Sequence, residues 1–120
     1  MKTDPEKERR GSRTRNIFFS AAEPSADSHC ANLIKALKAK PYDYRFVGVG
    51  GPKMAEAGCE LIARPADRAV MLHNAITNAG RFWKILKDIK RYYRATDIDL
   101  TVVCDSPAFN FHVAKIARKH

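Results

Sequence analysis

Residues 20–29 carry a dense group of hydroxyl, carboxyl and imidazole side chains: Ser20, Glu23, Ser25, Asp27 and His29. They follow an apolar run and precede a helical pattern, and the start of a helix attracts anions through its free N–H groups and its dipole. The stretch therefore predicts a polar loop that binds sugar hydroxyls or phosphate, with His29 as a neutral donor or proton carrier. A competing interpretation is that Ser25 or Asp27 caps the helix and that His29 lies on the surface.

Asp105 is the candidate general base. It directly follows the largely apolar run 100–104, and a carboxylate at such a sheet edge can accept a proton from a bound hydroxyl group. Ser106 precedes Pro107, which predicts an extended turn that holds the carboxylate outward. Asn110 closes the same loop as a candidate substrate ligand. The alternative is that Asp105 only hydrogen-bonds the following turn.

Gly50 and Gly51 form the third candidate loop. Adjacent glycines permit positive φ and let a ligand approach the backbone closely, although a plain strand-to-helix turn would use them equally well. The sequence contains neither GxGxxG nor GxxxxGK[ST]. Dinucleotide binding, P-loop NTPase activity and a flavodoxin-like nucleotide or flavin site are therefore disfavoured.

The elements that position these loops alternate between strand and helix. Continuous apolar runs predict strands over 17–21 and 100–104, and two further segments, 44–49 and 60–63, are also predicted as strands. Apolar residues at helical spacing and helix-ending residues predict helices over about 27–40, 52–57, 78–95 and 111–119, and residues 64–79 show no clear element. Pro24 should end the first strand. This order predicts an α/β fold, a doubly wound parallel sheet with the three loops at one edge.

Length and composition limit the functions that the chain can have. The chain has 120 residues, enough for one domain over 15–120 after a charged, disordered leader over 1–14. A net charge of +9 favours acidic partners. No apolar run is long enough to span a bilayer. The three cysteines form no CxxC pair and are expected to act as small buried hydrophobes in a reducing cytoplasm.

The predicted helix over 78–95 is basic and aromatic. Trp83, Tyr92 and Tyr93 lie among six cations, a mixture that suits the surface of an anionic membrane. A helix of an α/β layer with a solvated basic face would have the same composition, so both interpretations stay open. No signature of a recognition module accompanies it, and nucleic acid is not expected as a partner.

With these loops in view, the chain resembles the amino-terminal part of lipid-A-disaccharide synthases. The similarity follows the chain nearly from the leader to its end. It is carried by Ser-Ala-Ala-Glu-Pro-Ser-Ala-Asp over 20–27, Ala-Asn-Leu-Ile-Lys-Ala-Leu-Lys over 31–38, Phe-Val-Gly-Val-Gly-Gly-Pro-Lys-Met over 46–54, Ala-Gly-Cys-Glu over 57–60, Ala-Val-Met over 69–71 and Asp-Ser-Pro-Ala-Phe-Asn over 105–110.

The resemblance implies a Rossmann-like amino-terminal half of a two-domain GT-B glycosyltransferase, truncated here. It implies inverting transfer of diacylglucosamine from a UDP-linked donor to diacylglucosamine 1-phosphate, a phosphorylated glycolipid acceptor. Asp105 would be the base, and Glu23, Ser25 and Asp27 would belong to the polar loop that meets the substrate. No cofactor or bound metal is implied, because the UDP-sugar is a substrate expected on the second domain.

The same resemblance implies a cytoplasmic protein, peripheral on the anionic inner leaflet of the inner membrane. Three glycines of the family are replaced by Ala22, Ala26 and Cys30, which adds side chains where backbone should approach substrate or pack closely. Residues 72–75 depart from the family's Gly and Glu. The 120-residue chain alone is expected not to catalyse the reaction. The alternative to a part of a synthase is a non-catalytic domain that binds glycolipid or anionic membrane.

Overall fold

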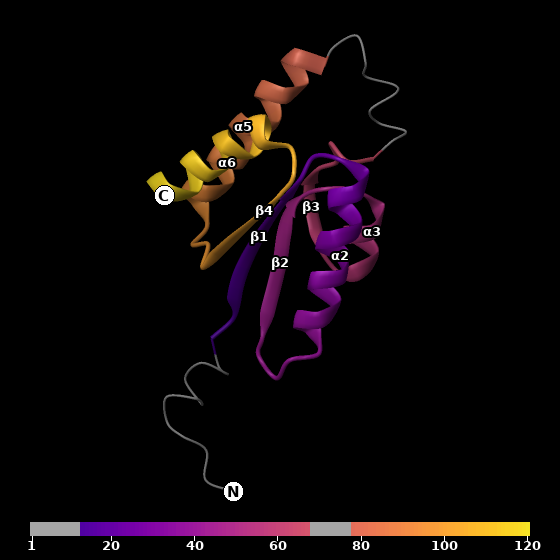
Figure 1. Ribbon diagram of the computed structural model, residues 1–120. Helices are drawn as coiled ribbons and strands as arrows, with labels where there is room; N and C mark the ends of the chain where they lie inside the picture. The colour runs from indigo at the N-terminus through magenta and orange to yellow at the C-terminus, as the bar shows by residue number, and fades with distance from the viewer. Residues whose placement is uncertain (1–12, 68–77) are drawn as a thin grey trace, which may run out of the picture.

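Four parallel strands form one sheet in the order β3-β2-β1-β4 (Figure 1). A computed structural model of the chain describes residues 13–67 and 78–120. The strands are β1 (Arg15–Ala21), β2 (Tyr44–Val49), β3 (Glu60–Ala63) and β4 (Leu100–Cys104). β1 pairs in parallel with β2 on one side and with β4 on the other, so it is one of the two inner strands of the sheet.

Helices cover both faces of this sheet. On one face lie α2 (Pro24–Lys38) and α3 (Pro52–Ala57), and on the other lie α5 (Asn78–Ala95) and α6 (Pro107–Lys119) (Figure 1). Because side chains alternate along a strand, Phe19 packs with the α2 and α3 side whereas Phe18 packs with Ile89 and Val113 on the other. The predicted doubly wound, Rossmann-like α/β fold is confirmed.

Two helices begin earlier than predicted. α2 starts at Pro24 and α6 at Pro107, so each proline stands in the first helical turn. Proline suits this position because its missing N–H has no partner within the helix there and its φ is already helical. The predictions that Pro24 only ends a strand and that α6 starts near residue 111 were therefore wrong.

β4 differs from the other long strands in its burial. Leu100 and Val103 are 55% and 45% exposed, although the apolar run predicted a strand like the buried β1. β4 is one of the two edge strands of the sheet formed by the described residues, so one flank has no neighbouring strand there. No helix in residues 13–67 and 78–120 is long and apolar enough to cross a membrane.

The strand order creates a switch point between β1 and β4. From β1 the chain moves outward through β2 to β3, and it then returns to place β4 on the opposite side of β1. Connections that leave β1 and β4 diverge toward opposite faces, and ligands of open α/β sheets bind where this happens. The loops that follow β1 and β4 lie at the same end of the sheet (Figure 1).

Candidate active site

The loop after β4 presents Asp105. Its side chain is exposed, as a base that meets a substrate must be. Asp105 and Ser106 adopt left-handed backbone conformations, with φ values of 53° and 45°. The extended turn predicted from the residue before proline was therefore wrong: the left-handed region also avoids the clash that proline imposes on a right-handed neighbour.

Ser20 and Asn110, both predicted to bind substrate, are buried and bind each other. The Ser20 hydroxyl donates to Asn110 Oδ1 at 2.6 Å, and the two residues are 0% and 5% exposed. Asn110 Nδ2 donates to the carbonyl oxygens of Cys104 and Asp105. The structure thus brings these two residues together with Asp105, but beneath the loop and not on its outer side.

The loop after β1 leaves three of the predicted residues free to meet a ligand. Glu23 is the N-cap of α2, yet its side chain makes no capping hydrogen bond, and it is exposed. Ser25 and His29 are exposed on the first turns of α2. Neither side chain caps α2, so that alternative for Ser25 is not what the structure shows. Together with Asp105 they form the accessible polar groups at the switch point.

Asp27 has a different position from these residues. It is 2% exposed, and its carboxylate accepts hydrogen bonds from the backbone N–H groups of Gly51, Lys53 and Met54 at 3.0, 3.0 and 2.9 Å. These N–H groups open α3, so Asp27 caps that helix across space and does not cap α2, on which it lies. Its carboxylate is occupied by the protein itself.

Close packing surrounds Gly50 and Gly51, by the flexible Met54 side chain at Gly50 and by the hydrogen-bonded Asp27 carboxylate and the Ala66 carbonyl oxygen at Gly51. A Cβ on Gly50 would lie 2.2 Å from Met54 Sδ, and one on Gly51 would lie 2.7 Å from Asp27 Oδ2. Gly51 is extended, with φ −140°, and among the described glycines only Gly58 has a positive φ. The pair therefore forms the strand-to-helix turn that was the alternative interpretation, without using the positive φ that glycine permits, and the protein's own atoms occupy the space beside both residues.

The three cysteines lie in or against the core on the α2 side of the sheet. Cys30 and Cys59 are buried in the core on the α2 side, and the partly buried Cys104 packs against it, which confirms their prediction as small hydrophobes. Burial raises the pKa of Cys30 to about 12, and the neighbouring Cys104 thiol adds to the shift. Burial also raises the pKa of Cys59 to about 12 and raises that of Cys104.

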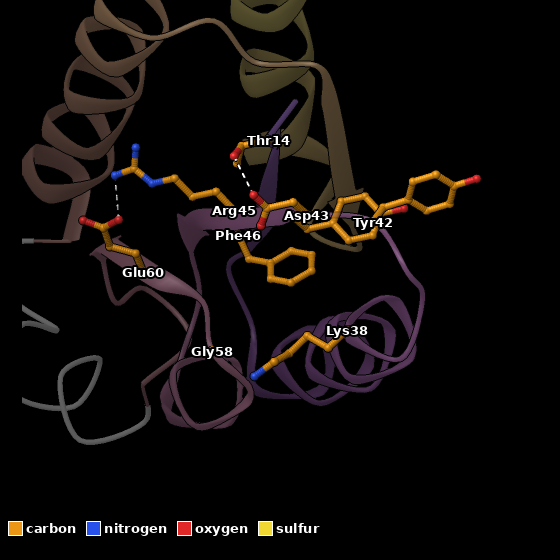
Figure 2. Close-up of a pocket in the computed structure, with 9 residues that line it drawn as sticks. Thr14, Lys38, Tyr42, Asp43, Arg45, Phe46, Gly58 and Glu60 are labelled. Carbon is orange, nitrogen blue, oxygen red and sulfur yellow. Dashed lines mark hydrogen bonds and ion pairs between the residues drawn. The ribbon is translucent and has the colours of Figure 1, made fainter. Parts of the chain in front are cut away.

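A hollow of about 490 Å³ lies at the opposite end of the sheet, where the strands begin (Figure 2). Its polar groups are largely paired within the protein. Lys38 donates to the carbonyl oxygen of Ala57 at the end of α3, Arg45 pairs with Glu60 at 3.0 Å, and Thr14 donates to Asp43. This hollow is separate from the candidate site, because none of the predicted site residues lines it.

Comparison with known proteins assigns the sequence to a family. The sequence model described as "Lipid-A-disaccharide synthetase" matches residues 17–120. The chain belongs to the lipid-A-disaccharide synthetase family. Its relatives include lipid-A-disaccharide synthases of Trichlorobacter lovleyi, 34% identical over 89% of this chain, and of Coxiella burnetii, 34% identical over 88%. Lipid-A-disaccharide synthase 1 of Legionella pneumophila is 39% identical over 86% of it.

The chain spans only 27% to 28% of the length of these synthases. Its parallel α/β sheet with helices on both faces is consistent with part of the Rossmann-like amino-terminal half of a GT-B fold. Residues 1–12 of the leader predicted over 1–14, and the departing residues 72–75, lie outside the described residues. Within 13–67 and 78–120 there is no group of three or more His, Cys, Asp or Glu side chains arranged to hold a metal ion.

The three residues that the resemblance placed at glycine positions of the family are accommodated inside the domain. Ala26 and Cys30 are 0% and 2% exposed and belong to the core on the α2 side, while Ala22 packs against the opposite core.

One polar contact near this loop was missed by the sequence reasoning. Lys53 Nζ donates to Ser28 Oγ at 3.0 Å and joins α3 to α2. Only its place directly after Gly-Gly-Pro could have suggested it.

Proposed function

We propose that this domain forms the acceptor side of a lipid-A-disaccharide synthase. The reaction is inverting transfer of diacylglucosamine from a UDP-linked donor to diacylglucosamine 1-phosphate, with release of UDP. This chain supplies the acceptor-binding loops and the base. The UDP-linked donor is a substrate that binds a second domain, and no metal or other cofactor takes part.

The observation that carries this proposal is the exposed Asp105 at the switch point of a domain from this family. In an inverting transfer the acceptor hydroxyl attacks the anomeric carbon, the bond to UDP breaks, and the hydroxyl proton passes to a base. Asp105 takes that proton, since a general base must be accessible and held in one direction. Glu23, Ser25 and His29 meet the acceptor's polar groups from the loop after β1.

The fit of the 1-phosphate to this edge has an electrostatic basis. The first turn of α2 offers backbone N–H groups, and the helix dipole favours a negative charge there. Lys53 adds a cation on the neighbouring α3, where its ammonium bridges to Ser28. Asp27 and Gly51 serve the site indirectly, because they fix α3 against α2.

Titration of the ¹⁵N-labelled chain with diacylglucosamine 1-phosphate in detergent micelles tests the acceptor role. Amide signals of the non-proline residues in 22–29 and 104–110 should shift, and those of the hollow around Tyr42 and Glu60 should not. Diacylglucosamine without the phosphate is the matched ligand control and should bind about tenfold or more weakly, the loss expected when charge-assisted hydrogen bonds disappear. Shifts confined to the far hollow, or none, would refute the assignment.

A second function, binding to an anionic membrane surface, is favoured by the groove between α5 and α6. Its volume is about 340 Å³, and its rim carries Lys87, Lys90 and Lys115. Trp83 is 59% exposed beside it, and its ring lies 5.4 Å from that of His112. An exposed indole among lysines suits the interface of an anionic bilayer. This is the interpretation that the sequence left open beside a solvated helix face.

Co-sedimentation with vesicles tests this second function. Vesicles with anionic phospholipid should bind the chain, neutral vesicles should not, and Trp83→Ala should weaken binding. Lys35→Gln, which removes an exposed cation from α2 on the opposite face of the sheet, is the matched control. Binding that is indifferent to lipid charge would contradict a membrane role. Peripheral association with the cytoplasmic face of the inner membrane belongs to this proposal.

Sequencing of the coding DNA beyond the codon for His120 separates the catalytic proposal from a binding role alone. If the frame continues into a second Rossmann-like domain, Asp105→Ala in that product should abolish disaccharide formation without unfolding it. If the frame stops, the chain is a glycolipid- or membrane-binding domain. Retained transfer in Asp105→Ala would exclude Asp105 as the base.

A further inference from the structure

The loop between β4 and α6 passes through two consecutive left-handed residues, Asp105 and Ser106. Within residues 13–67 and 78–120 they are the only non-glycine residues with positive φ. Side chains disfavour this conformation because Cβ crowds the neighbouring carbonyl group. A pair of such residues persists only where the surrounding structure holds it.

A single residue, Asn110, binds three successive carbonyl groups of this loop. Its side-chain Nδ2 donates to the carbonyl oxygens of Cys104 at 3.0 Å and Asp105 at 2.5 Å. Its backbone N–H donates to the carbonyl oxygen of Ser106 at 2.9 Å. Asn110 is only 5% exposed, so water competes little for these bonds. The direction of each peptide group from Cys104 to Ser106 is thereby fixed.

Ser20 sets the orientation of the Asn110 amide. Its hydroxyl donates to Asn110 Oδ1 at 2.6 Å, and Ser20 lies fully buried in β1 in register with Val103 of β4. An amide has its acceptor on one side and its two donors on the other. With Oδ1 held toward β1, both Nδ2 hydrogens face the loop. The loop is therefore tied at once to β1 and to α6.

We propose that Ser20 and Asn110 are positioning residues that hold the loop in its left-handed conformation and so fix the direction in which the Asp105 carboxylate leaves the sheet edge. Neither contacts the acceptor, which differs from the sequence prediction that both bind substrate. The consequence for proton transfer rests on the proposed function. The conformational claim rests on these hydrogen bonds alone.

The test compares Asn110→Leu with the unaltered chain by NMR spectroscopy. Leu has a similar size and removes the amide without burying a charge. The unaltered chain should give strong intraresidue NH–Hα NOEs at Asp105 and Ser106, typical of positive φ, and the variant should lose them. Ser20→Ala, a smaller change, should weaken the same NOEs and decides the question if Asn110→Leu does not fold. Asn32→Leu on the exposed side of α2 is the matched control and should change neither.

Affinity for diacylglucosamine 1-phosphate separates positioning from direct binding. If Ser20 and Asn110 only position the loop, the dissociation constant of the folded variants should stay within about threefold, whereas loss of a substrate hydrogen bond costs about tenfold. Unchanged NOEs in both variants, or a tenfold loss of affinity in a folded variant, would overturn the inference. If the unaltered chain does not bind the acceptor, the proposed function fails while the NOEs still decide the conformational claim.

Discussion

Replacement of Asp27 should destabilise the domain more than replacement of any exposed acidic residue around it. The Asp27 carboxylate accepts three backbone hydrogen bonds at the start of α3, and those from Gly51 and Met54 are buried. Asp27→Ala would leave these donors without a partner. Hydrogen bonds to a charged group contribute about 1.5 to 3 kcal/mol each. Because water can reach Lys53 N–H, we expect a total loss of about 4 kcal/mol.

Asp27→Asn separates the effect of the negative charge and of the Lys53 hydrogen bond from that of the two hydrogen bonds that an amide oxygen can still accept. One amide oxygen can still accept from Gly51 and Met54, which share the same carboxylate oxygen in the native domain. The NH₂ group then faces the Lys53 N–H, so one bond and the charge are lost. We expect a cost of about 2 kcal/mol, roughly half that of Asp27→Ala.

Urea unfolding of the 120-residue chain, followed by circular dichroism at 222 nm, measures these differences. Domains of this size commonly have a free energy of unfolding of about 5 to 15 kcal/mol. The Asp27→Ala variant should therefore still fold, with a small free energy of unfolding that the assay can measure. Glu23→Ala is the matched control, because Glu23 is exposed on the same loop and makes no capping bond. It should change stability by less than about 0.5 kcal/mol. An Asp27→Ala cost no larger than that of Glu23→Ala would refute the capping role.

Three further predictions concern glycine packing and the buried thiols. Gly48→Ala should lower the free energy of unfolding by about 3 kcal/mol or more, because its Cβ would lie 2.0 Å from a backbone oxygen of β1. Gly80→Ala, which has open space around it in a helix, should raise the free energy of unfolding by about 0.5 to 1 kcal/mol in the same urea assay. The raised pKa values of Cys30 and Cys59, from 9.0 to about 12, mean that the unfolded chain ionises first. The contribution of these thiols to the free energy of unfolding should therefore be complete below about pH 9 and be lost as the pH rises toward 12. The decrease should be less steep in Cys30→Ala, and a free energy of unfolding that does not change over this pH range would contradict the prediction. At pH 8, iodoacetamide should label Cys104 before Cys30 and Cys59 by mass spectrometry, since only Cys104 is partly exposed; equal labelling would argue against the buried positions.

The order of helices and strands could be predicted from the sequence because it depends on local patterns. Apolar runs such as Ile17 to Phe19 predicted strands on the correct residues, and helical spacing predicted α5 over Asn78–Ala95. The prolines were harder to interpret. Pro24 and Pro107 are compatible with either a turn or a first helical turn, and only the hydrogen bonds of the neighbouring residues decide between them.

The candidate site was predicted in part. The sequence correctly located polar residues at the ends of β1 and β4, and Asp105 and Glu23 are exposed there. It did not distinguish exposed from buried polar groups. Ser20 and Asp27 have the same side-chain chemistry whether they meet a ligand or the backbone of another element, and those partners are 90 and 24 to 27 residues away in the chain.

The sequence by itself determined the class of fold, the family and the residue types available at the sheet edge, since these follow from local periodicity and from motifs. Only the tertiary structure decided the strand order β3-β2-β1-β4 that creates the switch point, and which polar groups the protein uses for itself. Asp27 caps α3 and Asn110 holds the Asp105 loop because packing brings distant segments within hydrogen-bonding distance. A buried polar group must find such a partner, and its identity depends on how the layers assemble.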